Sequence, residues 1–342
     1  MVQDKIKLKM KKIAWLLVFV ISFTACNDVI FEEDLASSSP KENFEYLWRE
    51  CDEKYSYFEL KEIDWNEVYN RYEPRITEDM SRLELFNTLG EMLNELRDDH
   101  TNLFSRFNVS FFGVQNEGLD NLDFRIVTDN YLPRNYYISG PFVHDFIAGG
   151  EVGYVRFRSF TGGVDGFNLG FILSRYAVTR GIILDMRENG GGAVSDVFDL
   201  LSHFVDQPTT VFESRIKNGP GHNDFSELEP AIVQPSAGVR YLGRVIVLVD
   251  RGTFSAGSFT ALATKAIPNM VLMGDTTGGG LGLPNGGQLP NGWTYRFSVT
   301  QALDLNGNNY ENGVPPDIFA TLNREDTSRD EVIDRAIEEL TR

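Results

Sequence analysis

The chain has 342 residues, of which 42% are hydrophobic and 24% charged, and it contains 2 cysteines. This composition excludes a disordered chain, a collagen and a disulfide scaffold. The length allows two domains, or one large α/β domain with a helical appendage. Asp and Glu total 50 against 32 Lys and Arg, which gives a net charge of -18. A surface of this sign repels a polyphosphate, so we expect no nucleic acid partner.

The N-terminus has the pattern of an export signal. Five lysines precede an apolar run over residues 13–24. This run is shorter than the roughly 20 residues that span a bilayer, and the combination is typical of a signal peptide. It ends in Phe23-Thr24-Ala25-Cys26, which resembles the lipobox of bacterial lipoproteins and implies cleavage before Cys26 and a lipid on its thiol. An unlipidated secretory peptide with an incidental cysteine is the alternative.

These features divide the N-terminal part of the chain. They predict a signal peptide over residues 1–25 and a lipidated tether over residues 26–42, which is polar and rich in serine. We expect the mature protein to be exported and anchored to a membrane of the bacterial cell envelope through Cys26, with the outer membrane as the expected location.

Residues 43–107 carry hydrophobic side chains at helical spacing. One stripe runs from Phe44 to Cys51 and another from Leu83 to Leu96. Such stripes predict amphipathic helices that pack on one another and on a neighbouring sheet. We therefore predict an N-terminal helical region, with Asp64 and Ser81 as helix caps.

Strand patterns dominate from residue 111 onward, and helical patterns separate several of them. Strands are predicted at 124–127, 136–138, 152–157, 181–186, 245–249 and 271–273, and helices at 167–178, 193–205 and 255–267. This alternation predicts an α/β fold with a parallel sheet covered by helices. No Gly-x-Gly-x-x-Gly stands at a strand-to-helix turn in the sequence, so we expect no dinucleotide cofactor.

Two of the strand-to-helix junctions have the residues of a reactive site. In the first, three glycines, 190–192, precede a helix; their N–H groups can face an anion or oxyanion, although a tight turn also uses glycine. In the second, Ser255 follows a strand and opens a helix, so that its hydroxyl and the Ala256 N–H are neighbours. The alternative for Ser255 is a helix cap.

The order of four sequence blocks resembles the C-terminal-processing and tricorn-type serine peptidase family. These blocks are Asp185-x-Arg187-x-Asn189-Gly190-Gly191, Asp250 to Ser255-Ala256, Gly274-Asp275-Thr276-Thr277-Gly278 and Gly313-Val314-Pro315-Pro316-Asp317. The resemblance implies a crotonase/ClpP-like core of repeated β-β-α units over residues 151–342, preceded by the helical region. C-terminal-processing members insert a PDZ domain, but residues 108–150 are too few for one, so we expect a short β-rich connection there.

The two branches of the family use different catalytic bases, and the sequence distinguishes between the two arrangements. The C-terminal-processing branch has a lysine at the position of Gly280, and Lys265 lies about 15 Å along the helix from Ser255, out of reach. The tricorn-like branch has a histidine and an acid at the positions of His100 and Glu311. The resemblance therefore implies the tricorn-like arrangement.

These residues have the chemistry of an acyl-transfer site. Imidazole is the natural base for a serine hydroxyl near neutral pH, so we assign Ser255 as nucleophile and His100 as general base. Glu311 would orient the ring or stabilise the imidazolium, as the acid of other triads does, and Asp99 is a second candidate for that role. The N–H groups of Ala256 and of Gly190 or Gly191 would form the oxyanion hole.

The remaining histidines are predicted to be structural, and no pair of them has metal-ligand spacing, so we expect neither a metal nor another cofactor. The hypothesis is a lipid-anchored serine peptidase that cleaves peptides or unfolded polypeptides through an acyl-enzyme. A non-catalytic binding lipoprotein on the same scaffold is the main alternative. An esterase that acts on a non-peptide substrate is another.

Overall fold

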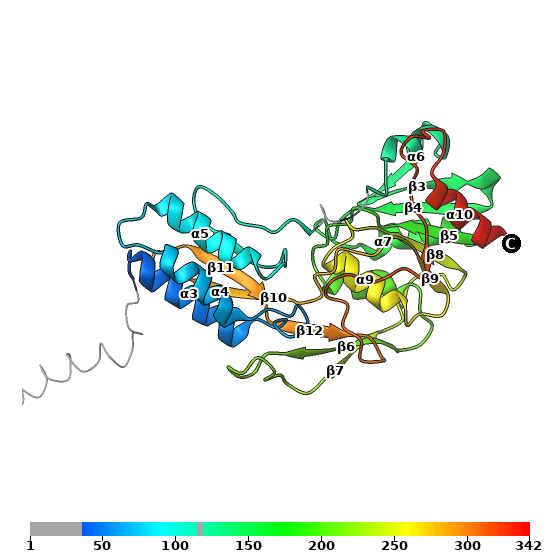
Figure 1. Ribbon diagram of the computed structural model, residues 1–342. Helices are drawn as coiled ribbons and strands as arrows, with labels where there is room; N and C mark the ends of the chain where they lie inside the picture. Colours follow the sequence, from blue (N-terminus) through cyan, green and yellow to red (C-terminus); the bar gives the residue numbers. More distant parts are fainter. Residues whose placement is uncertain (1–35, 115–117, 119) are drawn as a thin grey trace, which may run out of the picture.

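The computed structural model describes residues 36–114, 118 and 120–342 of the chain. The predicted signal peptide, Cys26 and most of the predicted tether lie outside these residues. The described chain forms two lobes, a smaller one that contains the first helices and a larger one built on a seven-stranded sheet (Figure 1). None of the helices in the described part is both long and apolar enough to cross a membrane.

The smaller lobe is built from helices near the N-terminus and a three-stranded sheet. The helices are α3 (Pro40–Lys54), α4 (Trp65–Tyr72), η1 (Glu73–Arg75) and α5 (Arg82–Asn94). The sheet contains β1 (Asn102–Phe104), β10 (Pro284–Gln288) and β11 (Thr294–Ser298), in the order β1-β11-β10. The predicted caps are confirmed, because the Asp64 and Ser81 side chains accept from N–H groups in the first turns of α4 and α5.

The hairpin β10–β11 joins two distant parts of the sequence. β11 pairs with β1 in antiparallel register, Leu103 opposite Tyr295. Trp293 and Phe297 from this hairpin are buried in the same core as Phe44 and other side chains of the first helices. The smaller lobe is therefore not a contiguous segment, and the chain passes from it into the larger lobe and back.

The larger lobe centres on one mixed sheet. In spatial order its strands are β13 (Ile318–Phe319), β9 (Met270–Gly274), β8 (Val245–Val249), β5 (Gly181–Asp185), β4 (Val152–Phe157), β3 (Phe142–Ile147) and β2 (Tyr137–Ser139). The five from β13 to β4 are parallel. β5 and β8 are buried along their whole length and end side by side, with Asp185 opposite Leu248. The loops that follow these two strands therefore leave the same edge of the sheet.

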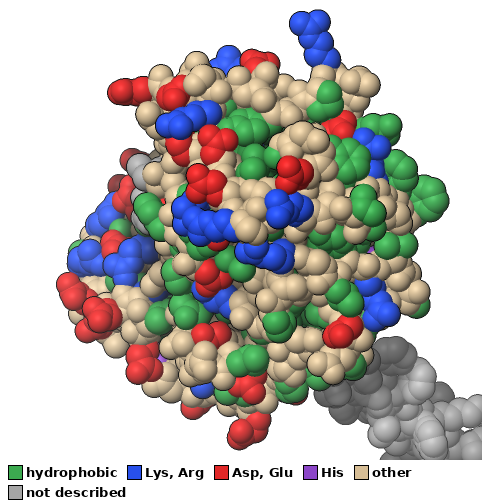
Figure 2. Space-filling model, turned by 90° about the vertical axis from the view of Figure 1, so that its right-hand side faces the viewer, with side chains coloured by type: hydrophobic (Ala, Val, Ile, Leu, Met, Phe, Trp, Pro, Cys, Tyr) green, Lys and Arg blue, Asp and Glu red, His purple; other side chains and the backbone are tan. Residues whose placement is uncertain are grey.

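Helices pack on the seven-stranded sheet, and a second sheet packs on two of these helices, α8 (Ser195–Ser202) and α9 (Ala256–Thr264). The other helices are η3 (Ala148–Gly150), α7 (Gly166–Arg175) and α10 (Glu331–Thr341), and the second sheet is the antiparallel sheet of β12 (Thr300–Leu303), β6 (Thr209–Ile216) and β7 (Glu229–Val233). The predicted α/β fold with an N-terminal helical region is confirmed. Figure 2 views the end of the molecule that carries α10, where acidic and basic side chains are intermixed.

One predicted strand is wrong. Residues 124–130 form the helix α6 (Phe124–Asn130), although we predicted a strand at 124–127. The Asp123 side chain accepts from the Arg125 N–H and caps the helix, which buries Ile126 and Val127 on one face. A short apolar run does not distinguish a strand from one turn of a buried helix.

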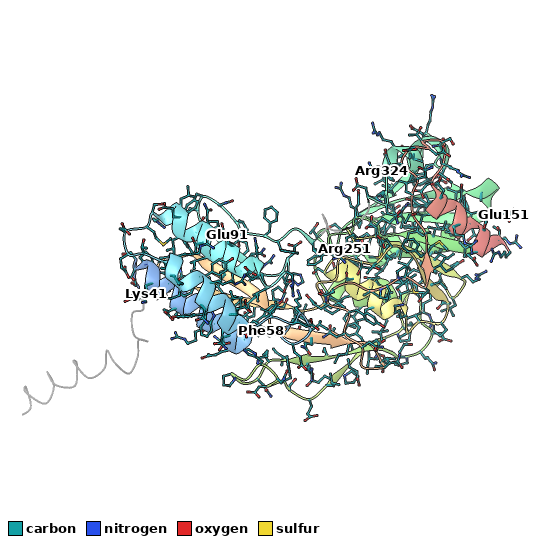
Figure 3. All side chains as sticks on the ribbon, in the orientation of Figure 1. Lys41, Phe58, Glu91, Glu151, Arg251 and Arg324 are labelled. Atoms are coloured by element: carbon teal, nitrogen blue, oxygen red, sulfur yellow. The ribbon has the colours of Figure 1, made fainter. Side chains whose placement is uncertain are left out.

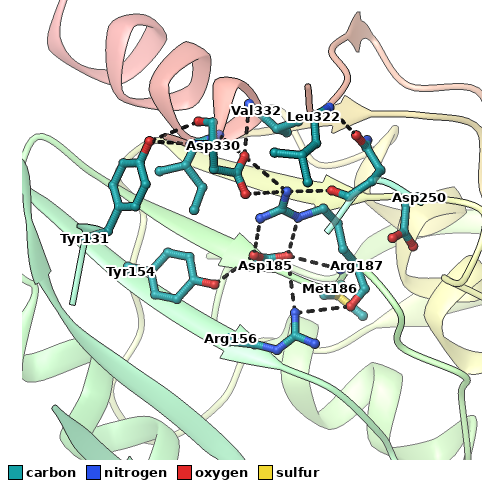
Figure 4. A network of polar contacts seen from close by, with 12 residues as sticks. Tyr131, Tyr154, Arg156, Asp185, Met186, Arg187, Asp250, Leu322, Asp330 and Val332 are labelled. Carbon is teal, nitrogen blue, oxygen red and sulfur yellow. Dashed lines mark hydrogen bonds and ion pairs between the residues drawn. The ribbon is translucent and has the colours of Figure 1, made fainter. Parts of the chain in front are cut away.

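A buried ion network lies under the end of β5 (Figure 4). Arg187 is fully buried and donates to Asp185 at 2.7 Å and to Asp330, the cap of α10, at 2.9 Å. The Tyr154 hydroxyl donates to the same Asp185 carboxylate at 2.7 Å. The network therefore connects the first family block to the C-terminal helix.

Candidate active site

Asn189 holds together the two loops that follow β5 and β8. Its carbonyl accepts from the Phe254 N–H at 2.9 Å. Its side chain donates to Phe157 O at 2.8 Å and accepts from the Gly191 N–H at 3.0 Å. The glycine loop and the serine loop are thus fixed against each other by one side chain and its backbone.

Ser255 stands at the start of α9 in a backbone conformation that is rare for a residue with a side chain. Its φ is 55° and its ψ is -122°, and strain of this kind costs about 1 to 3 kcal/mol and is concentrated at functional sites. The Ser255 N–H donates to Gly279 O at 3.0 Å, which holds the turn. The hydroxyl makes no capping bond, so the helix-cap alternative does not describe it. It faces His100 instead, with Oγ 3.0 Å from Nε2.

The tautomer of His100 follows from its second contact. Nδ1 lies 2.7 Å from the carbonyl oxygen of Gly282. A carbonyl only accepts, so in the neutral ring Nδ1 carries the proton and Nε2 is free to accept from the Ser255 hydroxyl. Burial lowers the pKa of His100, and the Asp98 charge and the Gly282 carbonyl oppose that shift. The ring is therefore held in its neutral, basic form at neutral pH.

Glu311 reaches this histidine only through the backbone. Its Oε2 accepts from the N–H groups of Leu281 at 2.6 Å and Gly282 at 2.9 Å, so it holds the peptide segment whose carbonyl orients the ring. Burial, and then the charge of Asp98, raises the pKa of Glu311 to about 8.

The other residues that we considered for the base and the acid are engaged elsewhere. The Asp99 carboxylate accepts from Gly113 N–H at 2.5 Å and Val114 N–H at 2.8 Å, and it therefore anchors the connection between the lobes. Lys265 pairs with Asp317 at 2.9 Å. Gly280 has φ +73°, and a Cβ there would lie 2.4 Å from the Phe254 ring, so the position of the dyad lysine is closed to a side chain.

The predicted oxyanion donors differ in availability. Ala256 is the first residue of α9, where an N–H has no acceptor within its own helix. The Gly191 N–H already donates to the Asn189 side chain. Gly190 is exposed at the mouth of the loop, and its N–H has no acceptor within the described part of the chain. Ala256 and Gly190 are therefore the available pair.

Three residues of the site, Asp98, Ser298 and Gly282, were missed by the sequence analysis. Asp98 accepts from the His100 N–H at 2.8 Å and from the Ser298 hydroxyl at 2.8 Å. Gly282 contributes only its carbonyl, for which no side chain gives a signal. Asp98 could have been found, because an aspartate two residues before a histidine commonly bonds to that residue's backbone N–H.

A cavity of about 290 Å³ lies beside the site, where the two lobes meet. Arg251 lines it from the larger lobe (Figure 3), and Lys61 and Asp98 line it from the smaller one. Glu311 and Phe254, the residue before the serine, also border this space. The site therefore adjoins a pocket that carries both signs of charge.

The remaining histidines are bonded elsewhere in the fold. His144 contacts the hydroxyls of Ser139 and Tyr176, and His203 contacts Val239 O. His222 lies 2.9 Å from an Asp52 carboxylate oxygen and stacks on a phenylalanine ring. Within residues 36–114, 118 and 120–342, no group of three or more His, Cys, Asp and Glu side chains is placed to hold a metal ion.

Substitution of Gly191 by alanine is expected to displace the serine. Gly191 has φ +90°, and a Cβ there would lie 2.7 Å from Ser255 Cβ and 2.9 Å from the Ala256 nitrogen. Gly149→Ala is the matched control, because Gly149 also has positive φ (+68°) but open space around it. We expect both variants to lose some stability in urea unfolding, and only Gly191→Ala to lose at least about tenfold in the rate of Ser255 acylation. Equal acylation rates in the two variants would contradict this geometry.

A serine on a strained strand-to-helix turn, with a neutral imidazole at hydrogen-bond distance, defines a serine-hydrolase type of site. Comparisons with known proteins identify its class as that of the serine-type peptidases. The model of peptidase family S41 matches residues 151–320, and the model of the tricorn protease C1 domain matches residues 37–94. A protein of Parabacteroides merdae that is proposed to be a peptidase has 38% identity and a TM-score of 0.85, over 90% of this chain and 98% of its own. The chain therefore belongs to peptidase family S41.

Two further proteins show how far the similarity extends. Carboxy-terminal processing protease CtpA of Bacillus subtilis is 28% identical over 144 residues, which are 42% of this chain and 29% of CtpA. The chain thus spans less than a third of the length of this curated relative. Mature CPAF shares the fold, with a TM-score of 0.67 at 13% identity, over 88% of this chain and 96% of its own.

Proposed function

We propose that the protein is an active serine peptidase that cleaves peptides or unfolded polypeptides through an acyl-enzyme. The observation that carries this proposal is the position of His100, with Nε2 3.0 Å from Ser255 Oγ and Nδ1 2.7 Å from Gly282 O. Both the distance and the tautomer suit proton abstraction from the serine. Membership of peptidase family S41 supports a peptide bond as the bond that is cleaved.

The proposed reaction uses these atoms in two half-reactions. Ser255 Oγ attacks the substrate carbonyl carbon while its proton passes to His100 Nε2, and the resulting oxyanion accepts from the N–H groups of Ala256 and Gly190. The intermediate then collapses, and the leaving amine takes the proton from Nε2. A water molecule repeats the sequence on the acyl-enzyme and releases the free acid. Glu311 orients the imidazole indirectly, because it binds the Gly282 N–H while the carbonyl of the same residue contacts His100 Nδ1.

We also propose that the protein is exported and held at a membrane of the bacterial envelope by a lipid on Cys26. The support is the sequence pattern of residues 13–26. Cys26→Ser should move the protein from the membrane fraction of the native host to a fraction released without detergent. Retention of this variant in the membrane would contradict the lipid anchor and would leave the peptidase proposal unaffected.

The peptidase proposal is tested by hydrolysis of an unfolded protein such as reduced casein. The wild type should release peptides, and Ser255→Ala should lose this activity by at least about four orders of magnitude. Ser195→Ala is the matched control, because Ser195 also opens a helix after the glycine loop but is exposed. Hydrolysis of simple esters without cleavage of any peptide would favour the esterase alternative. Inertness of the folded wild type toward both would favour the binding protein.

A further inference from the structure

Asp98 is a buried carboxylate that connects to His100 from two sides. Its side chain is almost fully buried, with the residue 3% exposed. One oxygen accepts from the backbone N–H of His100 at 2.8 Å. The other accepts from the Ser298 hydroxyl at 2.8 Å, and Ser298 Oγ also lies 3.3 Å from Gly282 O, the carbonyl that holds Nδ1 of the ring. Glu311, in contrast, bonds to peptide N–H groups of the neighbouring loop.

We propose that Asp98, rather than Glu311, is the positioning residue whose negative charge stabilises the His100 imidazolium that forms when Ser255 is deprotonated. This inference rests on the proposed function, because it assigns a role within that reaction. It separates two tasks that a single acid performs in other triads. Glu311 fixes the direction of the ring through the backbone, and Asp98 supplies the charge.

The hydrogen-bond partners of the two carboxylates support this division. Asp98 accepts from one N–H and from the hydroxyl of Ser298, and the hydroxyl of Thr101 lies 3.4 Å from it. Both oxygens of Asp98 therefore accept a hydrogen bond, which favours its ionised form, whereas the two N–H groups that donate to Glu311 both donate to the same oxygen, Oε2. Burial opposes ionisation of Asp98, but the positive charges of Lys61 and His100 and these bonds hold its pKa below the ordinary value.

Glu311 is less readily ionised than Asp98. Two buried carboxylates that interact do not both ionise readily, because neither charge is screened by solvent. Burial and the charge of Asp98 raise the pKa of Glu311 above neutrality, to about 8. At neutral pH the pair therefore carries one negative charge, on Asp98.

The charges around His100 set the direction of the expected effect. Burial lowers the pKa of His100, Asp98 and Asp99 raise it, and Arg296 lowers it. Lys61 acts on Asp98 and Glu311 rather than directly on the ring. Removal of the Asp98 charge should therefore lower the pKa of His100 further. The neutral base would then persist to lower pH, but it would accept the serine proton less readily.

The test compares Asp98→Asn with Glu311→Gln. Each variant keeps the volume and an acceptor oxygen, so that the bonds to His100 N–H and to the Leu281 and Gly282 N–H groups are retained. The readout is the pH titration of the His100 ring by NMR. We expect the midpoint to fall by about one pH unit in Asp98→Asn and to stay within about 0.3 unit of the wild type in Glu311→Gln. The acid limb of kcat/KM should move in the same direction, with a tenfold or greater loss on its plateau in Asp98→Asn only.

Three results would overturn the inference. The first is a fall in the His100 midpoint in Glu311→Gln but not in Asp98→Asn, which would place the charge on Glu311. The second is an unchanged midpoint in both variants. The third concerns the wild type and needs no variant to fold. The inference predicts that ¹³C-labelled carboxyl groups show Asp98 ionised and Glu311 protonated at pH 7. A protonated Asp98 with an ionised Glu311 would contradict it. A wild type that cleaves no substrate contradicts the proposed function, whereas an active wild type with an unmoved Asp98→Asn titration contradicts only this inference.

Discussion

Replacement of His100 by alanine is expected to slow the acylation of Ser255 by about four orders of magnitude, the upper end of the contribution of a general base. Nε2 is 3.0 Å from the serine hydroxyl, and the dyad-lysine position is occupied by Gly280, where a Cβ would clash with Phe254. The measurement is the second-order rate of labelling by a fluorophosphonate, followed by intact-protein mass spectrometry.

His222→Ala is the control for this experiment. His222 also lies next to a carboxylate and on an aromatic ring, but it contacts Asp52 and Phe58 rather than the serine. Its substitution should leave the labelling rate within about twofold of the wild type. If His100→Ala retains more than a tenth of the wild-type rate while it remains folded, then His100 is not the base.

Replacement of Arg187 by methionine is expected to cost about 3 to 5 kcal/mol of unfolding free energy, because it leaves the buried Asp330 without its cation and the buried Asp185 with only Arg156, at 4.0 Å. Arg187 is fully buried between Asp185 and Asp330, at 2.7 Å and 2.9 Å. Methionine fills a similar volume without the charge. The change should appear in urea unfolding as a lower midpoint at an unchanged slope.

Arg180→Met is the matched control for the ion network. Arg180 pairs with Glu151 at 3.2 Å, but both side chains are about half exposed, and exposed pairs of this kind contribute about 0 to 1 kcal/mol. A loss in Arg187→Met no larger than in Arg180→Met would show that the buried network is not needed for stability.

The elements around the nucleophile were predictable because their signals are local. The buried strand before Ser255, the glycines 190–192 and the helix after each appear as short patterns in the sequence. The parallel pairing of β5 and β8 then places the two loops together. The order and spacing of the family blocks also predicted His100 and Glu311, which come from distant segments. The structure places His100 Nε2 3.0 Å from Ser255 Oγ, although the two residues are 155 positions apart in the chain.

The parts that escaped prediction depend on long-range or backbone contacts. The hairpin β10–β11 lies far along the chain, and nothing local indicates that it pairs with β1. The orientation of His100 depends on the carbonyl of Gly282, which every residue type possesses. The raised pKa of Glu311 depends on its burial next to Asp98, and burial of a polar residue is not visible in a hydrophobic pattern. The strand predicted at residues 124–127 is the helix α6 for a related reason, since a short apolar run fits both.

The assignment of Ser255 as nucleophile is tested most directly by identifying the residue to which a fluorophosphonate becomes attached in the folded wild-type protein. Peptide mapping after labelling should place a single stoichiometric adduct on Ser255, with none in Ser255→Ala. An adduct on another residue, or no adduct on protein that unfolds cooperatively in urea, would contradict the assignment of Ser255 as an activated nucleophile.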